Sequence, residues 1–226
     1  IISTTPEPTH FPMARESLGA GKHVFLEKPL ALTLEEADEL LALAERMNVK
    51  FTIGYSQRFN PKYAYVKQCL EDGTLGSFVS AMVSRNVSRS LGNKISGRTK
   101  LSPAAMEATH DIDFILWCLE PARPVRVYSQ TVHKVMESVT GAADCQWIMV
   151  TMDDGTAFTI GAGWIFPPGY PNYSSTWIEV VGSEGALIVD DTHRDVVLNT
   201  MAGGVVNPMS TVPGESVGHV YAGPMV

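Results

Sequence analysis

A lysine follows directly on a short apolar segment near the start of the chain, in the tripeptide Glu27-Lys28-Pro29. The preceding segment, His23 to Leu26, is predicted to be a buried strand of a parallel sheet. Ligands bind at the carboxyl ends of strands in open α/β sheets, so Lys28 is placed to reach a substrate hydroxyl. A lysine that is partly desolvated beside a cationic group has its pKa lowered toward neutrality, as a general base for an alcohol requires. The alternative is an ordinary surface lysine before a helix-starting proline.

The second candidate group is a histidine flanked by acidic residues, in Thr109-His110-Asp111-Ile112-Asp113. By helical spacing, one face of this segment carries Met106, His110, Asp113 and Trp117. Asp113 can therefore hold or polarise His110, and Glu107 lies one helical step earlier, also within reach. Histidine commonly serves as general acid or base near neutral pH. The alternative is a histidine that is only packed or capped within the helix.

The first quarter of the chain, from Ile1 to about Gln57, alternates short apolar runs with helical patterns, which is typical of the βα units of a parallel sheet. Strands are predicted over Ile1 to Ser3, His23 to Leu26 and Phe51 to Gly54, and a helix is predicted over His10 to Ala20. The clearest helix follows Pro29, where Thr33 and Glu36 form a capping box. Its apolar stripe consists of Ala37, Leu40, Leu41 and Ala44.

The pattern changes near Ser56 to Pro61, which predicts one domain over residues 1–57 and a second over residues 58–226. Early in the second domain we predict helices over Lys62 to Glu71 and Pro103 to Leu119. Between them we predict a strand over Ser77 to Arg85 and a polar, mobile loop over Ser88 to Ser102.

Strand patterns dominate the rest of the chain and predict a mostly antiparallel sheet. The predicted strands are Val125 to His133, Gln146 to Met152, Thr156 to Trp164, Thr176 to Val181 and Ala186 to Val189. Asp153-Asp154-Gly155 is predicted to be a hairpin turn. The last stretch, Met201 to Val226, has no periodic signal and is predicted to be a loop or a truncated tail.

Charge and cysteine content exclude several classes of function. The net charge of −7 disfavours a broad contact with a phosphate backbone, so nucleic acid is not an expected partner. The three cysteines are far apart and outside any metal-binding spacing, so we expect neither a disulfide framework nor a metal site. No apolar run approaches the roughly 20 residues that cross a bilayer, so we expect no membrane partner and a cytoplasmic location. Because Ile1 lies inside an apolar run and no element closes the chain at Val226, both ends are expected to be cut.

A series of short motifs occurs in a fixed order along the chain. They are Ser3-Thr4-Thr5-Pro6 followed by His10, Gly21-Lys22-His23-Val24 leading into Glu27-Lys28-Pro29, Gly54-Tyr55-Ser56-Gln57-Arg58-Phe59-Asn60-Pro61, the His110-x-x-Asp113 helix, Gly163-Trp164-Ile165-Phe166-Pro167 and Gly182-Ser183-Glu184-Gly185. Taken together, these motifs resemble the Gfo/Idh/MocA family of oxidoreductases over nearly the whole chain.

The resemblance implies a fold that is α/β plus α+β. Residues 1–57 would form the C-terminal part of a Rossmann-type parallel sheet that binds NAD or NADP. Residues 58–226 would form an α+β domain with an open, mostly antiparallel sheet, through which such proteins often form homo-oligomers. The resemblance also implies hydride transfer at a secondary alcohol of a small polyhydroxylated substrate, such as a sugar, an inositol or a related polyol.

Individual roles follow from the same resemblance. Lys28 matches the motif lysine near substrate and nicotinamide, where a cis bond often precedes the proline, and His110 matches the histidine that hydrogen-bonds or protonates the reacting oxygen. The positions expected to line the cofactor are Thr5, Pro6, His10, Glu27, Lys28 and Pro29. The positions expected near the substrate are Tyr55, Gln57, Arg58, Glu107 and Trp164. If Lys28 and His110 serve one carbinol, their side-chain ends should lie roughly 4 to 8 Å apart.

One departure from the family pattern concerns the helix histidine. Many sugar-oxidising members have an aspartate four residues before it, where this chain has Met106. A Lys/Asp/His triad is therefore not complete in this chain, and Glu107 is a candidate substitute.

The second departure is that no GxGxxG motif occurs in the chain. That loop and the helix start that follows it hold the pyrophosphate of a dinucleotide. We therefore expect this chain alone to bind NAD very weakly and to be inactive. Calorimetric titration should show no micromolar binding, and a micromolar Kd would contradict the expectation.

Three functions remain open. The leading one is an NAD(P)-dependent dehydrogenase in which Lys28 deprotonates the alcohol, His110 shares the proton or fixes the oxygen, and hydride passes to nicotinamide C4. A second is an NAD-using glycoside hydrolase of the same family, which would release free sugar without accumulating NADH. A third is a non-catalytic, sugar-sensing regulator, against which the presence of both Lys28 and His110 argues.

Overall fold

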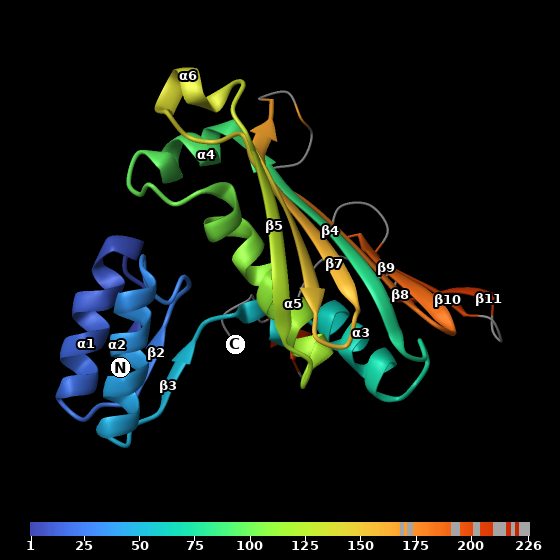
Figure 1. The fold of residues 1–226 in the computed structure, drawn as a ribbon, viewed down its shortest axis with the longest axis horizontal. Coiled ribbons are helices and arrows are strands. Elements are labelled where there is room, and N and C mark those ends of the chain that lie inside the picture. Colours follow the sequence, from blue (N-terminus) through green and yellow to red (C-terminus); the bar gives the residue numbers. More distant parts are fainter. Residues whose placement is uncertain are drawn as a thin grey trace. The chain divides into compact units, whose positions relative to one another are not determined.

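A computed structural model describes residues 1–167, 170, 174–190, 195–200, 204–209, 216–217 and 220–221. The chain divides into two units, Ile1–Tyr55 and Ser56–Val226, which are drawn in Figure 1 and are considered separately here.

The first unit contains a small parallel sheet with helices packed against it. The strands β1 (Ile2–Ser3), β2 (Val24–Leu26) and β3 (Phe51–Ile53) pair in the order β1-β2-β3. Both pairs are parallel, so the carboxyl ends of all three strands meet at one edge. The connecting helices are η1 (Glu7–Thr9), α1 (His10–Gly19) and α2 (Leu34–Arg46). The core consists of Ala14, Leu18, Val24, Leu26, Leu40, Leu43 and Ala44. The parallel βα arrangement predicted from the alternating pattern is confirmed.

Local signals define the ends of these helices. The hydroxyl of Thr33 accepts a hydrogen bond from the backbone N–H of Glu36 at 3.2 Å, and the carboxylate of Glu36 accepts one from the N–H of Leu32 at 3.1 Å. The predicted capping box is thus present, with its second bond one residue earlier than usual. Gly21 has φ of +69°, which ends the turn after α1 in a conformation that favours glycine.

The second unit is built on a large open sheet of eight strands among the residues described. Its strand order is β11-β10-β9-β8-β4-β7-β6-β5, and all neighbours are antiparallel except β4 and β7. The bounds are β4 (Phe78–Ser88), β5 (Pro124–Val132), β6 (Cys145–Met152), β7 (Ala157–Phe166), β8 (Ser174–Gly182), β9 (Gly185–Asp190), β10 (Asp195–Thr200) and β11 (Gly204–Met209). A separate hairpin joins β12 (Ser216–Val217) to β13 (Val220–Tyr221). This confirms the predicted fold class, an α/β segment followed by an α+β segment with an open sheet.

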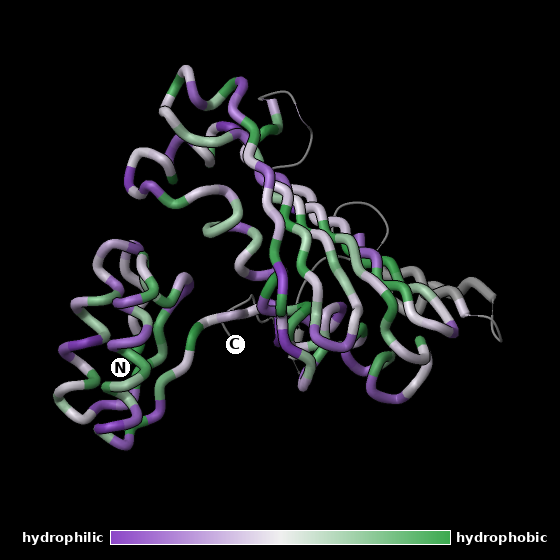
Figure 2. The backbone as a smooth tube through the Cα atoms, in the orientation of Figure 1, coloured by the Kyte–Doolittle hydropathy of each residue, from purple (hydrophilic) through white to green (hydrophobic). Residues whose placement is uncertain are grey.

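One face of this sheet packs against helices. The helical elements are η2 (Ser56–Phe59), α3 (Pro61–Glu71), α4 (Arg89–Ser96), a π-helical turn η3 (Ala104–Ala108), α5 (Thr109–Leu119) and α6 (Met136–Thr140). The rings of Tyr63 on α3 and Phe114 on α5 meet edge to face with centroids 4.8 Å apart, inside a core that includes Phe158 and Ile160 of β7. Figure 2 shows hydrophobic residues recurring along the strands of the large sheet.

The segment after β4 corrects the sequence analysis. Ser88 to Ser102 was predicted to be a mobile loop, but Arg89–Ser96 forms α4. The hydroxyl of Ser88 caps this helix by accepting from the N–H of Leu91 at 3.4 Å, and Ile95 is buried one turn later. Polar and glycine residues dominate this segment, so its few apolar residues did not indicate a helix in the sequence. The helix forms because Gly92 allows it to approach Trp164 closely.

The end of the chain also differs from the prediction. Met201 to Val226 was predicted to be a loop or tail, whereas β11, β12 and β13 lie within it. Pro208 lies in β11, which is an edge strand and so can accommodate a residue that lacks a backbone N–H. The stretch has no periodic signal, so no strand was predicted in it.

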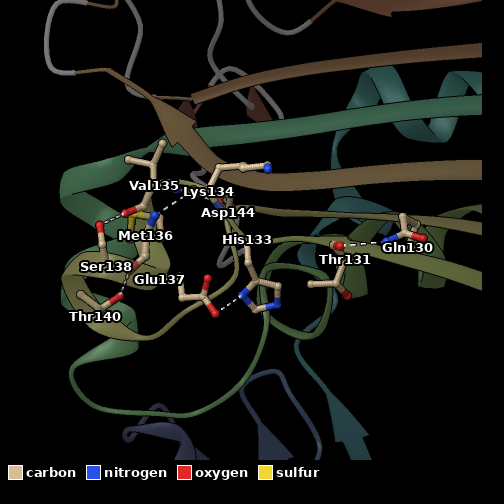
Figure 3. A network of polar contacts seen from close by, with 10 residues as sticks. All are labelled: Gln130, Thr131, His133, Lys134, Val135, Met136, Glu137, Ser138, Thr140 and Asp144. Carbon is tan, nitrogen blue, oxygen red and sulfur yellow. Dashed lines mark hydrogen bonds and ion pairs between the residues drawn. The ribbon is translucent and has the colours of Figure 1, made fainter.

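A network of polar contacts holds the connection between β5 and β6 (Figure 3). The carboxylate of Asp144 accepts hydrogen bonds from the backbone N–H groups of Lys134, Val135 and Met136 at the start of α6. Burial alone raises the pKa of Asp144, but these donors outweigh it and leave the pKa below its ordinary value. The charged carboxylate therefore stabilises this connection at neutral pH, and that contribution is lost as the pH falls through the lowered pKa.

Candidate active site residues

The first group of candidate residues lies at the carboxyl edge of the small parallel sheet. Thr5 follows β1, Glu27 and Lys28 follow β2, and Gly54 follows β3. The hydroxyls of Ser3 and Thr5 lie 3.3 Å apart, and the Glu27 carboxylate accepts from the backbone N–H of Lys28 at 2.8 Å. The Lys28–Pro29 bond is cis, as the sequence motif suggested.

This edge fits part of a dinucleotide site. Residues that carry hydroxyl, carboxylate and ammonium groups follow the ends of the parallel strands, which is where open α/β sheets bind nucleotides. A Cβ at Gly54 would lie 3.2 Å from the Phe25 ring and 3.5 Å from the carboxylate of Glu27, so the small residue keeps the backbone close to these groups. Thr5, Glu27 and Lys28 are thus suited to contact a bound nicotinamide nucleotide.

His10 lies beneath this edge and not on it. Its ring is only 1% exposed, and its two nitrogens contact two different turns. Nδ1 lies 2.7 Å from the carbonyl oxygen of Pro29, and Nε2 lies 2.8 Å from the carbonyl oxygen of Thr5. His10 thus lies between the turns that carry Thr5 and Lys28, and its expected place in the lining of the cofactor stays a prediction.

The second group of candidates lies on and around α5. His110 is half-buried in the first turn of α5, directly after the π-helical turn. Met106, four residues earlier, is buried in an apolar cluster with Trp164. Glu107 instead accepts a hydrogen bond from the indole Nε1 of Trp164 at 3.3 Å. Glu107 is therefore the carboxylate in this turn that is a candidate to replace the aspartate absent at Met106. π-helical turns often occur at functional sites.

Trp164 is fully buried, and its expected position near the substrate stays a prediction. Its side chain is 0% exposed and packs in an apolar cluster with Val87, Ile95 and Met106. It lies over Gly92, where a Cβ would come within 2.5 Å of the Trp164 Cβ. The indole donates a hydrogen bond to Glu107 and forms part of the apolar cluster that contains Met106.

Asp113 has a partner that the sequence analysis did not consider. Both of its carboxylate oxygens accept from the guanidinium of Arg58, at 2.8 Å from Nε and 2.7 Å from Nη2. The same guanidinium carbon lies 5.5 Å from the centroid of the Trp117 ring. Arg58, expected near the substrate, thus ties η2 to α5 one turn from His110. The expected interaction of Asp113 with His110 stays a prediction.

A buried ion pair joins α5 to β4, and it was not predicted from the sequence. Asp111 is 0% exposed and accepts from Arg85 on β4, at 2.7 Å from Nε and 2.8 Å from Nη2. Arg85 also donates to the hydroxyl of Tyr63 at 3.2 Å. Burial alone lowers the pKa of Arg85, but Asp111, and then Tyr63, raise it well above its ordinary value, so the guanidinium stays charged.

A signal for this pair was present in the alternation of β4. Arg85 follows Ala81 and Val83 at a period of two, so it belongs to the face that is buried. A cation on a core-facing position requires a buried anion. The position next to His110 supplies it.

The remaining candidates, Tyr55 and Gln57, lie on either side of the boundary between the two units along the chain. Tyr55 ends the first unit, and Gln57 lies in η2 of the second; both are half-buried. The expected approach of Lys28 to His110 stays a prediction.

Other chemistries find little support in the described part of the chain. Within it, no three His, Cys, Asp or Glu side chains gather as a metal site would require. Burial raises the pKa of the Cys118 thiol to about 12, so this cysteine is not an activated nucleophile. None of the described helices has the length and apolar character to cross a membrane.

Comparison with known proteins gives two family matches along the chain. Residues 1–55 match the oxidoreductase family with an NAD-binding Rossmann fold. Residues 63–188 match the GFO/IDH/MocA C-terminal domain.

Individual relatives agree with these matches. The chain is 28% identical over 213 residues to an uncharacterized oxidoreductase of Synechocystis, which covers 87% of this chain and 56% of the relative. It is 25% identical over 207 residues to the scyllo-inositol 2-dehydrogenase (NAD(+)) of Bacillus subtilis, covering 90% and 58%. The chain thus spans little more than half the length of these relatives.

A solved structure shares the fold. An inositol dehydrogenase homolog from Azotobacter vinelandii, complexed with NADH and myo-inositol, superposes with a TM-score of 0.79 at 21% identity, over 91% of this chain and 54% of that one. The two family matches run in the order in which the two units occur. The chain therefore belongs to the Gfo/Idh/MocA family of oxidoreductases, and its first unit is part of an NAD-binding Rossmann domain.

Proposed function

We propose that this chain is part of an NAD(P)-dependent dehydrogenase that oxidises a secondary alcohol of a small polyhydroxylated compound. The observation that carries the proposal is the position of Lys28 directly after the carboxyl end of β2, in a chain of this family. A cytoplasmic location accords with this proposal.

Lys28 is assigned the role of base. In its neutral form, the Nζ atom takes the hydroxyl proton as the C–O bond gains double-bond character. A bound nicotinamide would supply the hydride acceptor for the alcohol carbon. The Glu27 carboxylate is held by the backbone N–H of Lys28, which leaves its second oxygen able to accept from a hydroxyl.

His110 is assigned to the reacting oxygen, which it would hydrogen-bond as the carbonyl forms. Asp113 and Arg58 act on this histidine indirectly, because their bidentate ion pair fixes α5 against η2. Glu107 is assigned to a substrate hydroxyl, with Trp164 holding one of its oxygens. Tyr55 and Gln57 are assigned to further hydroxyl contacts.

The substrate class is proposed to be an inositol or a similar polyol. The relatives named above include an inositol dehydrogenase, and the candidate side chains carry carboxylate, imidazole, amide and phenol groups that recognise hydroxyls. The test is absorbance of NADH or NADPH on incubation of a chain that also carries the glycine-rich loop with a panel of inositols and sugars. Release of free sugar from a glycoside without accumulation of reduced cofactor would favour the hydrolase alternative, and no reaction of either kind would contradict both.

We also propose that the open sheet face joins two copies of this chain. Tyr128 on β5 is opposite Met149 on β6, and both are exposed, at 65% and 51%. Met82 on β4 and Trp147 on β6 are also exposed. Cross-strand pairing places Tyr128, Met149 and Met82 in one row across the sheet, through Thr159 of β7. An apolar row on the face away from the helices is typical of a protein interface.

Breaking this surface should change the oligomeric state. The double variant Tyr128→Glu/Met149→Glu is expected to turn a dimer into a monomer, because two carboxylates per copy would be buried without partners. Light scattering after size exclusion measures the mass. Val139→Glu, on the exposed side of α6, is the matched control and should leave the dimer intact. A wild-type chain that is monomeric at high concentration would contradict the proposal.

A further inference from the structure

His10 contacts two acceptors and no donor among its hydrogen bonds. Nδ1 lies 2.7 Å from the carbonyl oxygen of Pro29, and Nε2 lies 2.8 Å from the carbonyl oxygen of Thr5. A carbonyl oxygen can only accept a hydrogen bond, so each contact requires a proton on the ring nitrogen. A neutral imidazole carries a proton on one nitrogen only. In a neutral ring, one of the two contacts would therefore bring together two lone pairs at hydrogen-bond distance.

The ring cannot relieve such a contact by turning toward water. It is 1% exposed and lies at the first position of α1, between the turn after β1 and the turn after β2. Charged groups on the segments that contact it are Glu7 of η1, which is itself buried, and Glu27 and Lys28 of the second turn. These groups carry charges of both signs, so the two carbonyl contacts decide the state of the ring.

His23 provides the opposite case in the same unit. Its Nδ1 accepts a hydrogen bond from the backbone N–H of Lys50 at 2.9 Å. An accepting nitrogen has to be free of a proton, so this contact requires Nδ1 of His23 to be unprotonated. The two histidines therefore have contacts that demand different protonation states.

We propose that His10 is a positioning residue that functions as an imidazolium, donating from both ring nitrogens and so joining the Thr5 turn to the Pro29 turn. The carbonyl that it holds belongs to the residue directly after Lys28. His10 thereby fixes the path of the backbone next to Lys28, the proposed general base. It touches neither substrate nor cofactor. The charge on His10 is independent of the proposed function, whereas the consequence for Lys28 rests on it.

Nitrogen NMR of the chain as it stands tests the charge. With the six histidines labelled with ¹⁵N, a spectrum at neutral pH should show both ring nitrogens of His10 with protonated shifts. His23 should show one protonated and one unprotonated nitrogen. The variants His10→Gln and His23→Gln assign the two sets of signals by their loss. An unprotonated nitrogen on His10 under these conditions would overturn the proposal.

Kinetics test the positioning role in a chain that also carries the glycine-rich loop. His10→Gln keeps one donor for one carbonyl and loses the other, so the turn of Lys28 is held less firmly. We expect kcat to fall about tenfold while KM changes little. The substitution displaces the amine of Lys28, which acts on the proton, but does not remove it. His10→Arg, which can donate to both carbonyls, should recover part of kcat.

The outcomes separate the two claims. A His10→Gln protein that melts earlier but keeps its kcat would show that His10 serves stability alone, and the positioning role would be overturned. If the unaltered protein oxidises no polyol, the proposed function fails, while the NMR result still decides whether His10 is an imidazolium.

Discussion

Replacing Lys28 by Met is expected to lower kcat by about 10² to 10⁴-fold, the range that general acid–base catalysis supplies. Methionine is similar in length to lysine but has no nitrogen to take the hydroxyl proton. NAD affinity should change little, because the lost group acts on the proton and not on the dinucleotide. The measurement is steady-state reduction of NAD(P) by a polyol substrate, together with titration of the cofactor, in a chain that also carries the glycine-rich loop.

Lys22→Met is the matched control. Lys22 is an exposed lysine in the same unit, after α1, and its loss should leave kcat within twofold of the unaltered value. A Lys28→Met protein that keeps its kcat would remove Lys28 from the mechanism, whereas a fall in affinity for NAD with kcat preserved would assign it to cofactor binding.

Replacing Arg85 by Met is expected to reduce the free energy of unfolding by about 3 to 5 kcal/mol, because it leaves the fully buried carboxylate of Asp111 without its cation. The hydroxyl of Tyr63 loses a donor as well. Urea unfolding measures the change as a shift of the midpoint at constant slope. The loss should also be visible as reduced hydrogen-exchange protection in α5, since the ion pair fastens this helix to β4.

Two further variants serve as controls for the expected loss of stability in Arg85→Met. Arg85→Met/Asp111→Leu should recover most of the loss, because a buried ion pair replaced by apolar side chains of similar volume is often nearly neutral. Arg15→Met breaks an exposed ion pair with Glu39 and should cost less than about 1 kcal/mol. A cost for Arg85→Met as small as that of Arg15→Met would show that Asp111 finds another partner or is protonated.

The elements that could be predicted are those whose signals are local. The capping box at Thr33 and Glu36 marks the start of α2 from four consecutive positions. Alternation predicted a strand over Ser77 to Arg85, and β4 spans Phe78–Ser88. The Asp153-Asp154-Gly155 turn predicted the β6–β7 hairpin, and Gly155 has the left-handed φ of +88° that such turns need. In each case backbone geometry is decided by residues a few positions apart.

The features that were missed depend on distant partners. Asp111 and Arg85 are 26 residues apart, and Arg58 and Asp113 are 55 apart, so neither pair could be matched from the sequence alone. α4 depends on Trp164, against which Gly92 packs. The role of His10 in joining two turns depends on backbone carbonyls, which every residue carries and no motif marks.

The parallel pairing of β4 with β7 joins segments that are made at very different times during synthesis. β4 lies at the centre and pairs with β7 and β8, both encoded much later in the chain. During synthesis, β4 therefore emerges from the ribosome long before either neighbour exists, while the first unit can already close on contacts among its own residues. Closing such long loops costs entropy before any pairing rewards it, so formation of the large sheet is the slow step. Until β7 has been made, up to Phe166, β4 has no partner strand, and α3, α4 and α5 have to cover its apolar side.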